Sequence, residues 1–453
     1  PARVVSANAY LGALPIKAAL DAGAQIVITG RCVDSAVTLG VLMHAFGWQP
    51  HEYDKLASGS LAGHIIECGC QATGGLFTDW QQVPDWAHIG YPIVDCAADG
   101  TFTLTKPAGT GGLVTPAVVA EQMLYEIGDP GSYLLPDVVC DFRAVTMEQA
   151  GEHRVRVSGA RGRAPTPSYK VSATYVEGFK LSAQLTIVGF DAAAKARRTS
   201  EAILERARDW LAQAGLGDFS ATRVEVIGAE TSYGPHARAL QAREVVMRLS
   251  VRHPREEALE WLAREIAPAG TSWAPGTTGG GGGRSSPAPS ICQYAFLLDK
   301  SALAPAVTLD GVAVAVPPIP SGQPLAASPA LREQPIAAHE AGAERELPLI
   351  ALAHARSGDK GDTSNIGVIA REPRWLPILR RECTPERVAA YLAHLVDGPV
   401  TRYEVPGIHA LNFVCERALG GGGMASLRLD PLGKGMAQLL LGMPVRVPAG
   451  MLP

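Results

Sequence analysis

Residues 65–80 combine side chains that could transfer protons with a backbone that could approach a ligand closely. The segment reads IIECGCQATGGLFTDW and holds two carboxylates, Glu67 and Asp79, and three glycines. Cys, Phe and Trp prefer burial, whereas three glycines weaken a regular helix or strand. We therefore expect one wall of a partly buried site, with Glu67 or Asp79 as general acid or base and Thr73 as a ligand contact. The alternative is a close crossing of two structural elements without a ligand.

The thiols of the same segment are weaker candidates. His64, Cys68 and Cys70 could be imagined as zinc ligands, but the chain has no second Cys pair at zinc-ribbon spacing. No metal is predicted. A nucleophilic Cys68 would need a nearby base and a lowered pKa, and the glycines argue against a helix that would bring His64 beside it. A small buried thiol is the simpler interpretation.

A second segment, residues 106–116 (KPAGTGGLVTP), reads as a strand end, a glycine-rich loop and a helix start. Thr115 is a good N-cap and Pro116 a good first helical residue. Backbone N–H groups at such a position suit phosphate or carboxylate. The predicted anion-binding residues are Lys106, Gly109, Thr110, Gly111 and Gly112. The alternative is a close helix–strand crossing.

Polar residues also follow the nearly continuous apolar stretch 24–30, which is typical of a buried parallel strand. In open α/β sheets, ligands bind outside the carboxyl ends of the strands. Arg31 and Asp34 stand at that position and are predicted to be catalytic, with Arg31 orienting a carboxylate. An Arg–Asp pair beside a helix cap, without a ligand, explains the same residues.

Residues 357–365 (SGDKGDTSN) place two carboxylates, a lysine and an amide between two apolar strands and are predicted to form a polar loop. Gly, Asp, Asn and Ser favour turns, which explains part of this composition. The mixture of charges favours a recognition role. The predicted contacts are Asp359, Lys360, Asp362 and Asn365.

The whole chain sets the context for these candidates. Its 453 residues suggest two or three domains, and the net charge of −4 argues against nucleic-acid binding. No apolar run is long enough to span a membrane. Eight cysteines show no disulfide framework, so we expect a cytoplasmic protein. Because the chain starts at Pro1 within a predicted strand, we expect it to begin inside a larger parent.

The predicted elements suggest an α/β fold: a doubly wound, Rossmann-like layer with an α+β second part. A ferredoxin-like α+β domain is predicted after it. The expected boundaries are a large domain at 1–300, an Ala/Pro-rich linker at 301–346 and the small domain at 347–453.

Several long motifs resemble the acyclic terpene utilisation (AtuA) family. They include ITGRCVDSAVTLG, AGHIIECGCQATGGLFTDW, TKPAGTGGLVT and AHARSGDKGDTSNIGVIA. The resemblance implies the AtuA large domain up to about residue 300, truncated at its N-terminus, and the family's ferredoxin-like domain from about 347. Cys70 stands where small residues are more usual, and the glycine run 279–283 resembles a local expansion.

The resemblance also implies a role in the breakdown of citronellol and geraniol through CoA thioesters. Our leading hypothesis is a cytoplasmic enzyme that acts on a branched acyl-CoA or related carboxylate by a lyase or hydratase type of step. The cofactor stays open, with a CoA thioester as the candidate substrate. The alternative is a non-catalytic partner of a biotin-dependent acyl-CoA carboxylase, and a homo-oligomer is also an open expectation.

Overall fold

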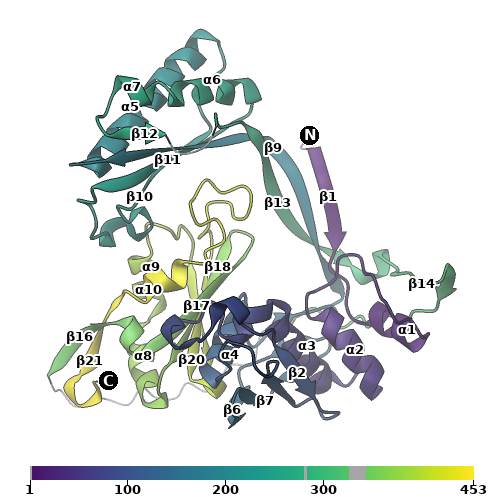
Figure 1. Ribbon diagram of the computed structural model, residues 1–453. Coiled ribbons are helices and arrows are strands. Elements are labelled where there is room, and N and C mark those ends of the chain that lie inside the picture. Colours follow the sequence, from purple (N-terminus) through teal and green to yellow (C-terminus); the bar gives the residue numbers. More distant parts are fainter. Residues whose placement is uncertain (1–2, 280–282, 326–342, 453) are drawn as a thin grey trace.

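The computed structural model describes residues 3–279, 283–325 and 343–452. Figure 1 shows two domains side by side at the base and a lobe above them, joined to the base by a long ribbon of strands. We call residues 10–163 the helical domain and residues 343–452 the C-terminal domain. No helix in these described ranges is long and apolar enough to cross a membrane.

The helical domain packs four helices around one apolar core, together with two small antiparallel sheets. Its second helix ends at Gly47 in the left-handed region (φ 64°), and Thr115 caps the fourth, as its sequence predicts. The helices are α1 (Leu14–Asp21), α2 (Ala36–Phe46), α3 (Tyr53–Glu67) and α4 (Pro116–Leu124). The sheets contain β2 (Ile93–Cys96), β3 (Phe102–Thr105), β6 (Thr146–Gly151) and β7 (Arg154–Ser158), and β4 (Tyr133–Leu134), β5 (Val139–Asp141) and β8 (Arg161–Arg163).

The ribbon is built on one 21-residue strand, β9 (Ser168–Val188), where the sequence predicts two strands with a turn between them. Its first half pairs with β1 (Arg3–Ala9) and with β13 (Ala288–Asp299), and its second half enters the lobe. The lobe contains β10 (Ala221–Ile227), β11 (Glu244–His253), β12 (Thr277–Gly279), α5 (Ala192–Gln213), α6 (Glu256–Ile266) and α7 (Ala269–Ser272). A separate hairpin, β14 (Val307–Leu309) and β15 (Val312–Val314), follows the ribbon.

The C-terminal domain has a four-stranded antiparallel sheet that is buried on both faces. Ile366 and Val368 pack into the core of this domain, while Ile369 packs into the core of the helical domain. This explains the continuous apolar stretch of β18. The elements are β16 (Glu344–Pro348), β17 (Ala353–Lys360), β18 (Thr363–Ala370), α8 (Leu376–Glu382), α9 (Pro385–Tyr391), β19 (Val400–Val405), β20 (Ala410–Cys415), α10 (Met436–Leu440) and β21 (Pro444–Pro448).

Three expectations about the elements are wrong. The Rossmann-like parallel layer is not formed, since every ladder between named strands of the described residues is antiparallel. Residues 24–30 form no strand, and Ile26 and Ile28 are largely exposed. The predicted loop 357–365 is a β-hairpin in which β17 and β18 pair from Lys360 and Thr363 onwards, with the turn at residues 361–362.

The predicted glycine-rich loop 279–283 and the linker 301–346 fall partly on residues 280–282 and 326–342, which lie outside the described residues.

Candidate active site

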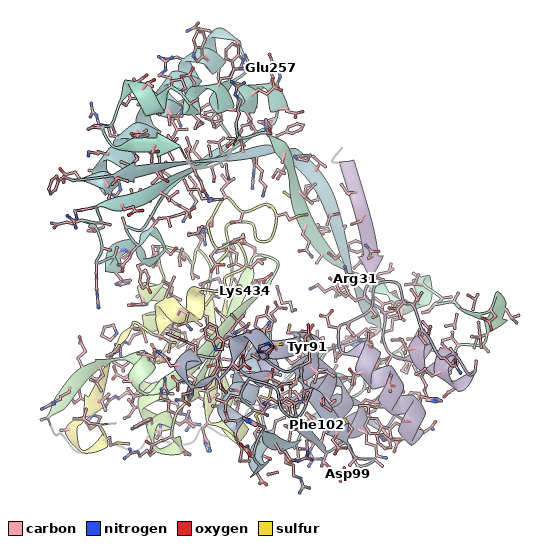
Figure 2. All side chains as sticks on the ribbon, viewed as in Figure 1. Arg31, Tyr91, Asp99, Phe102, Glu257 and Lys434 are labelled. Carbon is pink, nitrogen blue, oxygen red and sulfur yellow. The ribbon has the colours of Figure 1, made fainter. Side chains whose placement is uncertain are left out.

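Three of the predicted site residues line one open cleft of about 770 Å³: Arg31, Asp34 and Glu67. Asn8 of β1 lies on its rim. Asp34 stands just before α2, and Glu67 is the last residue of α3. Arg31 lies at the foot of the ribbon, where Figure 2 labels it. The cleft therefore joins three elements that are separate in the sequence.

Glu67 is paired with its neighbour Cys68. The Cys68 thiol donates a hydrogen bond to Glu67 Oε1 at 3.2 Å. Burial raises the pKa of the Glu67 carboxyl, and the negative charges of Asp34 and Glu126 add to this. Burial, with the neighbouring Glu67, also raises the pKa of the Cys68 thiol to about 12. The pair therefore offers a carboxyl group that takes up a proton more readily than an ordinary glutamate and a thiol that stays protonated.

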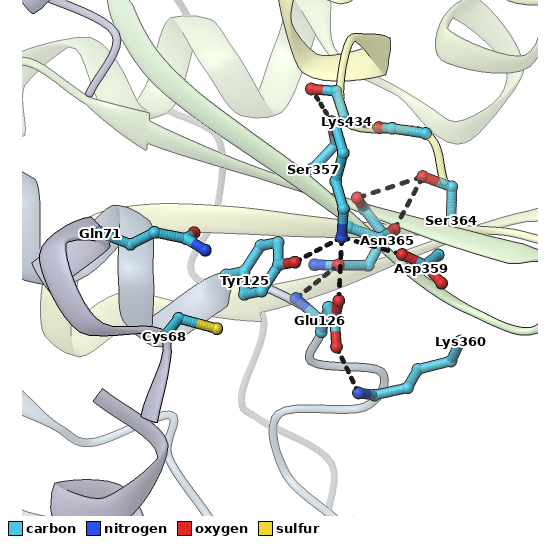
Figure 3. Close-up of polar contacts among 12 residues, drawn as sticks. Cys68, Gln71, Tyr125, Glu126, Ser357, Asp359, Lys360, Ser364, Asn365 and Lys434 are labelled. Atoms are coloured by element: carbon cyan, nitrogen blue, oxygen red, sulfur yellow. Dashed lines mark hydrogen bonds and ion pairs between the residues drawn. The ribbon is translucent and has the colours of Figure 1, made fainter. Parts of the chain in front are cut away.

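Where the helical domain contacts the C-terminal domain, two lysines of the C-terminal domain surround Glu126, which follows α4 (Figure 3). Lys360 Nζ lies 2.5 Å from Glu126 Oε2, and Lys434 Nζ lies 3.0 Å from Glu126 Oε1. Lys434 also donates hydrogen bonds to the hydroxyl of Tyr125 and, at 2.9 Å, to Asp359. Burial alone would raise the pKa of Glu126, but the lysine charges outweigh it and lower this pKa to about 2. Glu126 is thus a fixed anion.

The backbone of Glu126 is held in a left-handed conformation by asparagines of the C-terminal sheet. Glu126 has φ 61°, which is uncommon outside glycine. Its N–H donates to Asn365 Oδ1 at 2.9 Å, and Asn365 Nδ2 donates to Leu124 O at 2.7 Å. Asn412 donates to Ile127 O at 2.9 Å. Such strain persists only where the surroundings enforce it and is concentrated at functional sites.

Electrostatic interactions connect the cleft with the charged cluster at the contact between the domains. The negative charge of Glu126 raises the pKa of Glu67, and the positive charge of Lys360 lowers it. Burial would lower the pKa of Lys360, but negative charges around it, including Glu126 and Asp34, raise it above its usual value. A proton that leaves or reaches Glu67 therefore does so within the field of charges supplied by both domains.

Asp79 does not line the cleft but belongs to a group of hydrogen bonds and ion pairs that join the helical domain to the C-terminal domain. Both its carboxylate oxygens accept from Arg371, at 2.5 and 2.6 Å, and one also lies 3.1 Å from His354 Nε2. The adjacent Thr78 hydroxyl donates to Ala355 O at the edge of β17 at 3.1 Å. Arg371, above all, lowers the pKa of Asp79. This geometry describes a structural ion pair.

The glycine-rich loop also lies apart from the cleft, and its polar groups are engaged within the protein. Lys106 Nζ donates to Thr110 O at 2.7 Å. The amides of Gly111 and Gly112 donate to the carbonyls of His88 and Pro84 at 3.0 and 2.9 Å. Gly109, at φ 74°, makes the turn of the loop. The structure therefore gives the loop the packing role that the alternative interpretation describes.

Thr73 and Asp362 each hold a neighbouring segment. The hydroxyl of Thr73, fully buried in the 3-10 helix Gly69–Thr73, donates to Gly90 O at 2.6 Å. Asp362 Oδ1 accepts from the amides of Leu419 and Gly421 at 3.1 and 2.8 Å.

The sequence-based search did not select Tyr125, Glu126 or Lys434. Their signal was weak, because Tyr125 and Glu126 follow an apolar helix and Lys434 is a single charge in a glycine-rich stretch. The left-handed backbone at Glu126 would have been the clearest pointer, but a sequence does not display it. Among the described residues, no three His, Cys, Asp or Glu side chains are arranged to hold a metal ion.

The fold and the site define a mixed helix-and-strand protein with an open polar cleft in its N-terminal part and a charged cluster where the helical domain contacts the C-terminal domain. Residues 1–309 match the acyclic terpene utilisation family protein AtuA, and residues 347–446 match the AtuA ferredoxin-like domain. The chain belongs to the acyclic terpene utilisation (AtuA) family, as its motifs predict. The C-terminal domain is accordingly the family's ferredoxin-like domain. No curated protein and no solved structure matches significantly.

Proposed function

We propose that this chain is an enzyme that binds a branched carboxylate or its thioester in the cleft and transfers a proton to or from it. The observation that carries the proposal is the meeting of Arg31, Asp34 and Glu67 in one cleft of about 770 Å³. A volume of this size is in the range of small-molecule sites. The reaction would be of the lyase or hydratase type.

Each residue has a role that follows from its surroundings. Arg31 forms no ion pair with any residue that the structure describes, so its guanidinium is free to bind an anionic group of the ligand, which is the carboxylate of a free acid or a phosphate of a CoA thioester. Glu67, with its raised pKa, is the proton carrier. Glu126 stays ionised and holds the two lysines in place. Asp34, which lines the cleft beside Glu67, favours the protonated form of Glu67.

The family supports the substrate class. Acyclic terpene utilisation involves branched, unsaturated carbon chains, and addition or removal of water across such a chain needs an acid and a base close to the double bond. A cytoplasmic location is part of the same proposal.

The test is isothermal titration of this chain with geranyl-CoA, geranic acid and free CoA, followed by a turnover assay of every ligand that binds. We expect Glu67→Gln to bind the substrate but to lose turnover by about 100-fold or more, the usual contribution of a general acid or base. Glu205→Gln, on α5 in the lobe, is the matched control and should behave as wild type. No heat with any of the three ligands would overturn the proposal.

A different result would support the alternative function. If the chain shows no turnover but co-purifies with a biotin-dependent acyl-CoA carboxylase, and Glu67→Gln does not affect that complex, then the protein is a binding partner and the catalytic proposal is wrong.

A further inference from the structure

Two cations lie around the ring of Tyr10, the residue that follows β1. Arg31 Cζ lies 5.6 Å from the ring centroid and Lys170 Nζ lies 6.0 Å from it. Arg31 lines the cleft, and Lys170 is at the start of β9. Side chains far apart in the sequence thus place two positive charges about one aromatic ring.

The backbone fixes this arrangement. The Tyr10 N–H donates to Lys170 O at 2.9 Å, and the Leu11 N–H donates to Arg31 O at 3.2 Å. Val33 N–H in turn donates to Leu11 O at 2.9 Å. Residues 10–11 therefore tie the start of β9 to the segment that carries Arg31, so the two cations are held in position before any ligand arrives.

Two cations of this region have no carboxylate of the described residues in direct contact, although Asp34 and Glu67 line the same cleft as Arg31. Lys360 is paired with Glu126, and Lys434 with Glu126 and Asp359. By contrast, neither Arg31 nor Lys170 forms an ion pair with a residue of the described ranges. Burial lowers the pKa of Lys170, and the charge of Lys360 lowers it further. An anionic group of a ligand could pair with both Arg31 and Lys170.

We propose that Arg31 and Lys170 bind a phosphate or pyrophosphate group of the ligand, whose reacting end reaches Glu67 in the adjoining cleft. The guanidinium fork matches two phosphate oxygens, and the ammonium acts as a compact second charge. The hydroxyl of Tyr10 has no hydrogen-bond partner among the described side chains, so it could donate a hydrogen bond to the same phosphate group. A group with two or more negative charges fits two cations better than a single carboxylate does. The inference rests on the proposed function, because it assigns the charged end of the same ligand.

The experiment is calorimetric titration of the chain with inorganic pyrophosphate and, separately, with inorganic phosphate and acetate. We expect pyrophosphate to bind more tightly than acetate. Arg31→Gln and Lys170→Gln should each weaken pyrophosphate binding by about tenfold, the effect of losing one charge-assisted contact. Lys195→Gln on α5, which removes an equal charge in the lobe, should leave binding unchanged. Circular dichroism should confirm that each variant is folded.

Two results would overturn the inference. One is equal pyrophosphate binding by the wild type, Arg31→Gln and Lys170→Gln. The other is loss of binding in Lys106→Gln, which would locate the anion at the glycine-rich loop. The outcome is separable from the proposed function. Pyrophosphate binding that depends on Arg31 and Lys170, without turnover of any ligand, would support the anion site and reject the enzyme. Turnover that depends on Glu67, without pyrophosphate binding, would do the reverse.

Discussion

The side-chain oxygen of Asn365 accepts a 2.9 Å hydrogen bond from the backbone N–H of Glu126, so that a residue of one domain fixes the backbone of a site residue in the other. The same asparagine donates to Leu124 O and to Asn412 Oδ1, and its side chain is buried. The site and the domain contact therefore depend on the same hydrogen bonds. Changes at this contact should alter both stability and activity.

Asn365→Ala should destabilise the chain by about 2–4 kcal/mol, because it leaves the partly buried Glu126 N–H and the buried Leu124 O without partners. Urea unfolding measures the change. Gln293→Ala, which removes an exposed hydrogen bond to Ser172 on the ribbon, is the control and should cost less than about 1 kcal/mol. Equal losses in the two variants would contradict the buried network.

Gly358→Ala should weaken the contact between the domains, because a Cβ at this position would lie 2.5 Å from Glu126 Cγ and 2.8 Å from the Tyr125 ring. We expect a loss of about 1–3 kcal/mol and a lower melting temperature. Gly128→Ala is the matched control, since nothing lies within 4 Å of the added carbon. The idea fails if thermal unfolding ranks the two variants in the opposite order.

Glu121 should make stability depend on pH near neutrality. This carboxyl is buried beside the Thr78 amide, and burial raises its pKa from 4.5 to about 7. Between these values the folded state keeps a proton that the unfolded state has lost. The free energy of unfolding therefore falls as pH rises through this window, by about 3 kcal/mol in total.

Glu121→Gln removes this titration and keeps an oxygen to accept from Thr78. The variant should gain stability relative to wild type as pH rises from 4.5 to 8, measured by urea unfolding at several pH values. A difference that stays constant with pH would show that Glu121 does not titrate in this range.

Cys68 should prove unreactive, because burial and Glu67 raise the pKa of its thiol to about 12. Iodoacetamide at pH 7.5 should label it slowly, and Cys68→Ala should retain turnover. The variant loses the thiol donor that lowers the pKa of Glu67, so the pH profile should shift upward at the Glu67 limb. Rapid labelling, or complete loss of turnover in Cys68→Ala, would instead identify a nucleophile.

Local signals in the sequence were sufficient to locate the start of one helix. Thr115 with Pro116 correctly marked the start of α4. Capping and turn residues act within a few positions of the chain, so they can be recognised without the fold.

Sheet pairing was harder to predict. The apolar stretch 24–30 resembled a buried parallel strand, yet Ile28 is 93% exposed. The strand β18 looks apolar because both of its faces are covered, one by each domain. Periodicity within a strand cannot reveal which part of the chain covers it.

In the candidate site, too, local sequence signals could be predicted but tertiary contacts could not. Arg31, Asp34 and Glu67 were selected from residue type and position, and the cleft brings them together. Asp79 had equally suitable chemistry, but its partners Arg371 and His354 lie more than 270 positions away. Tertiary contacts therefore decide that Asp79 forms an ion pair between the domains while Glu67 lines the cleft.

The two lysines that neutralise Glu126 belong to the last hundred or so residues of the chain, and this sets an order for assembly during synthesis. Until Lys360 and Lys434 leave the ribosome, Glu126 has neither of its counter-ions, and the asparagines that hold its left-handed backbone are also missing. An incomplete chain then carries carboxylates that repel one another where the site should form. Completion of the C-terminal domain is the event that charges and shapes the site, so a prematurely terminated product would bind its ligand poorly even if its helices had folded.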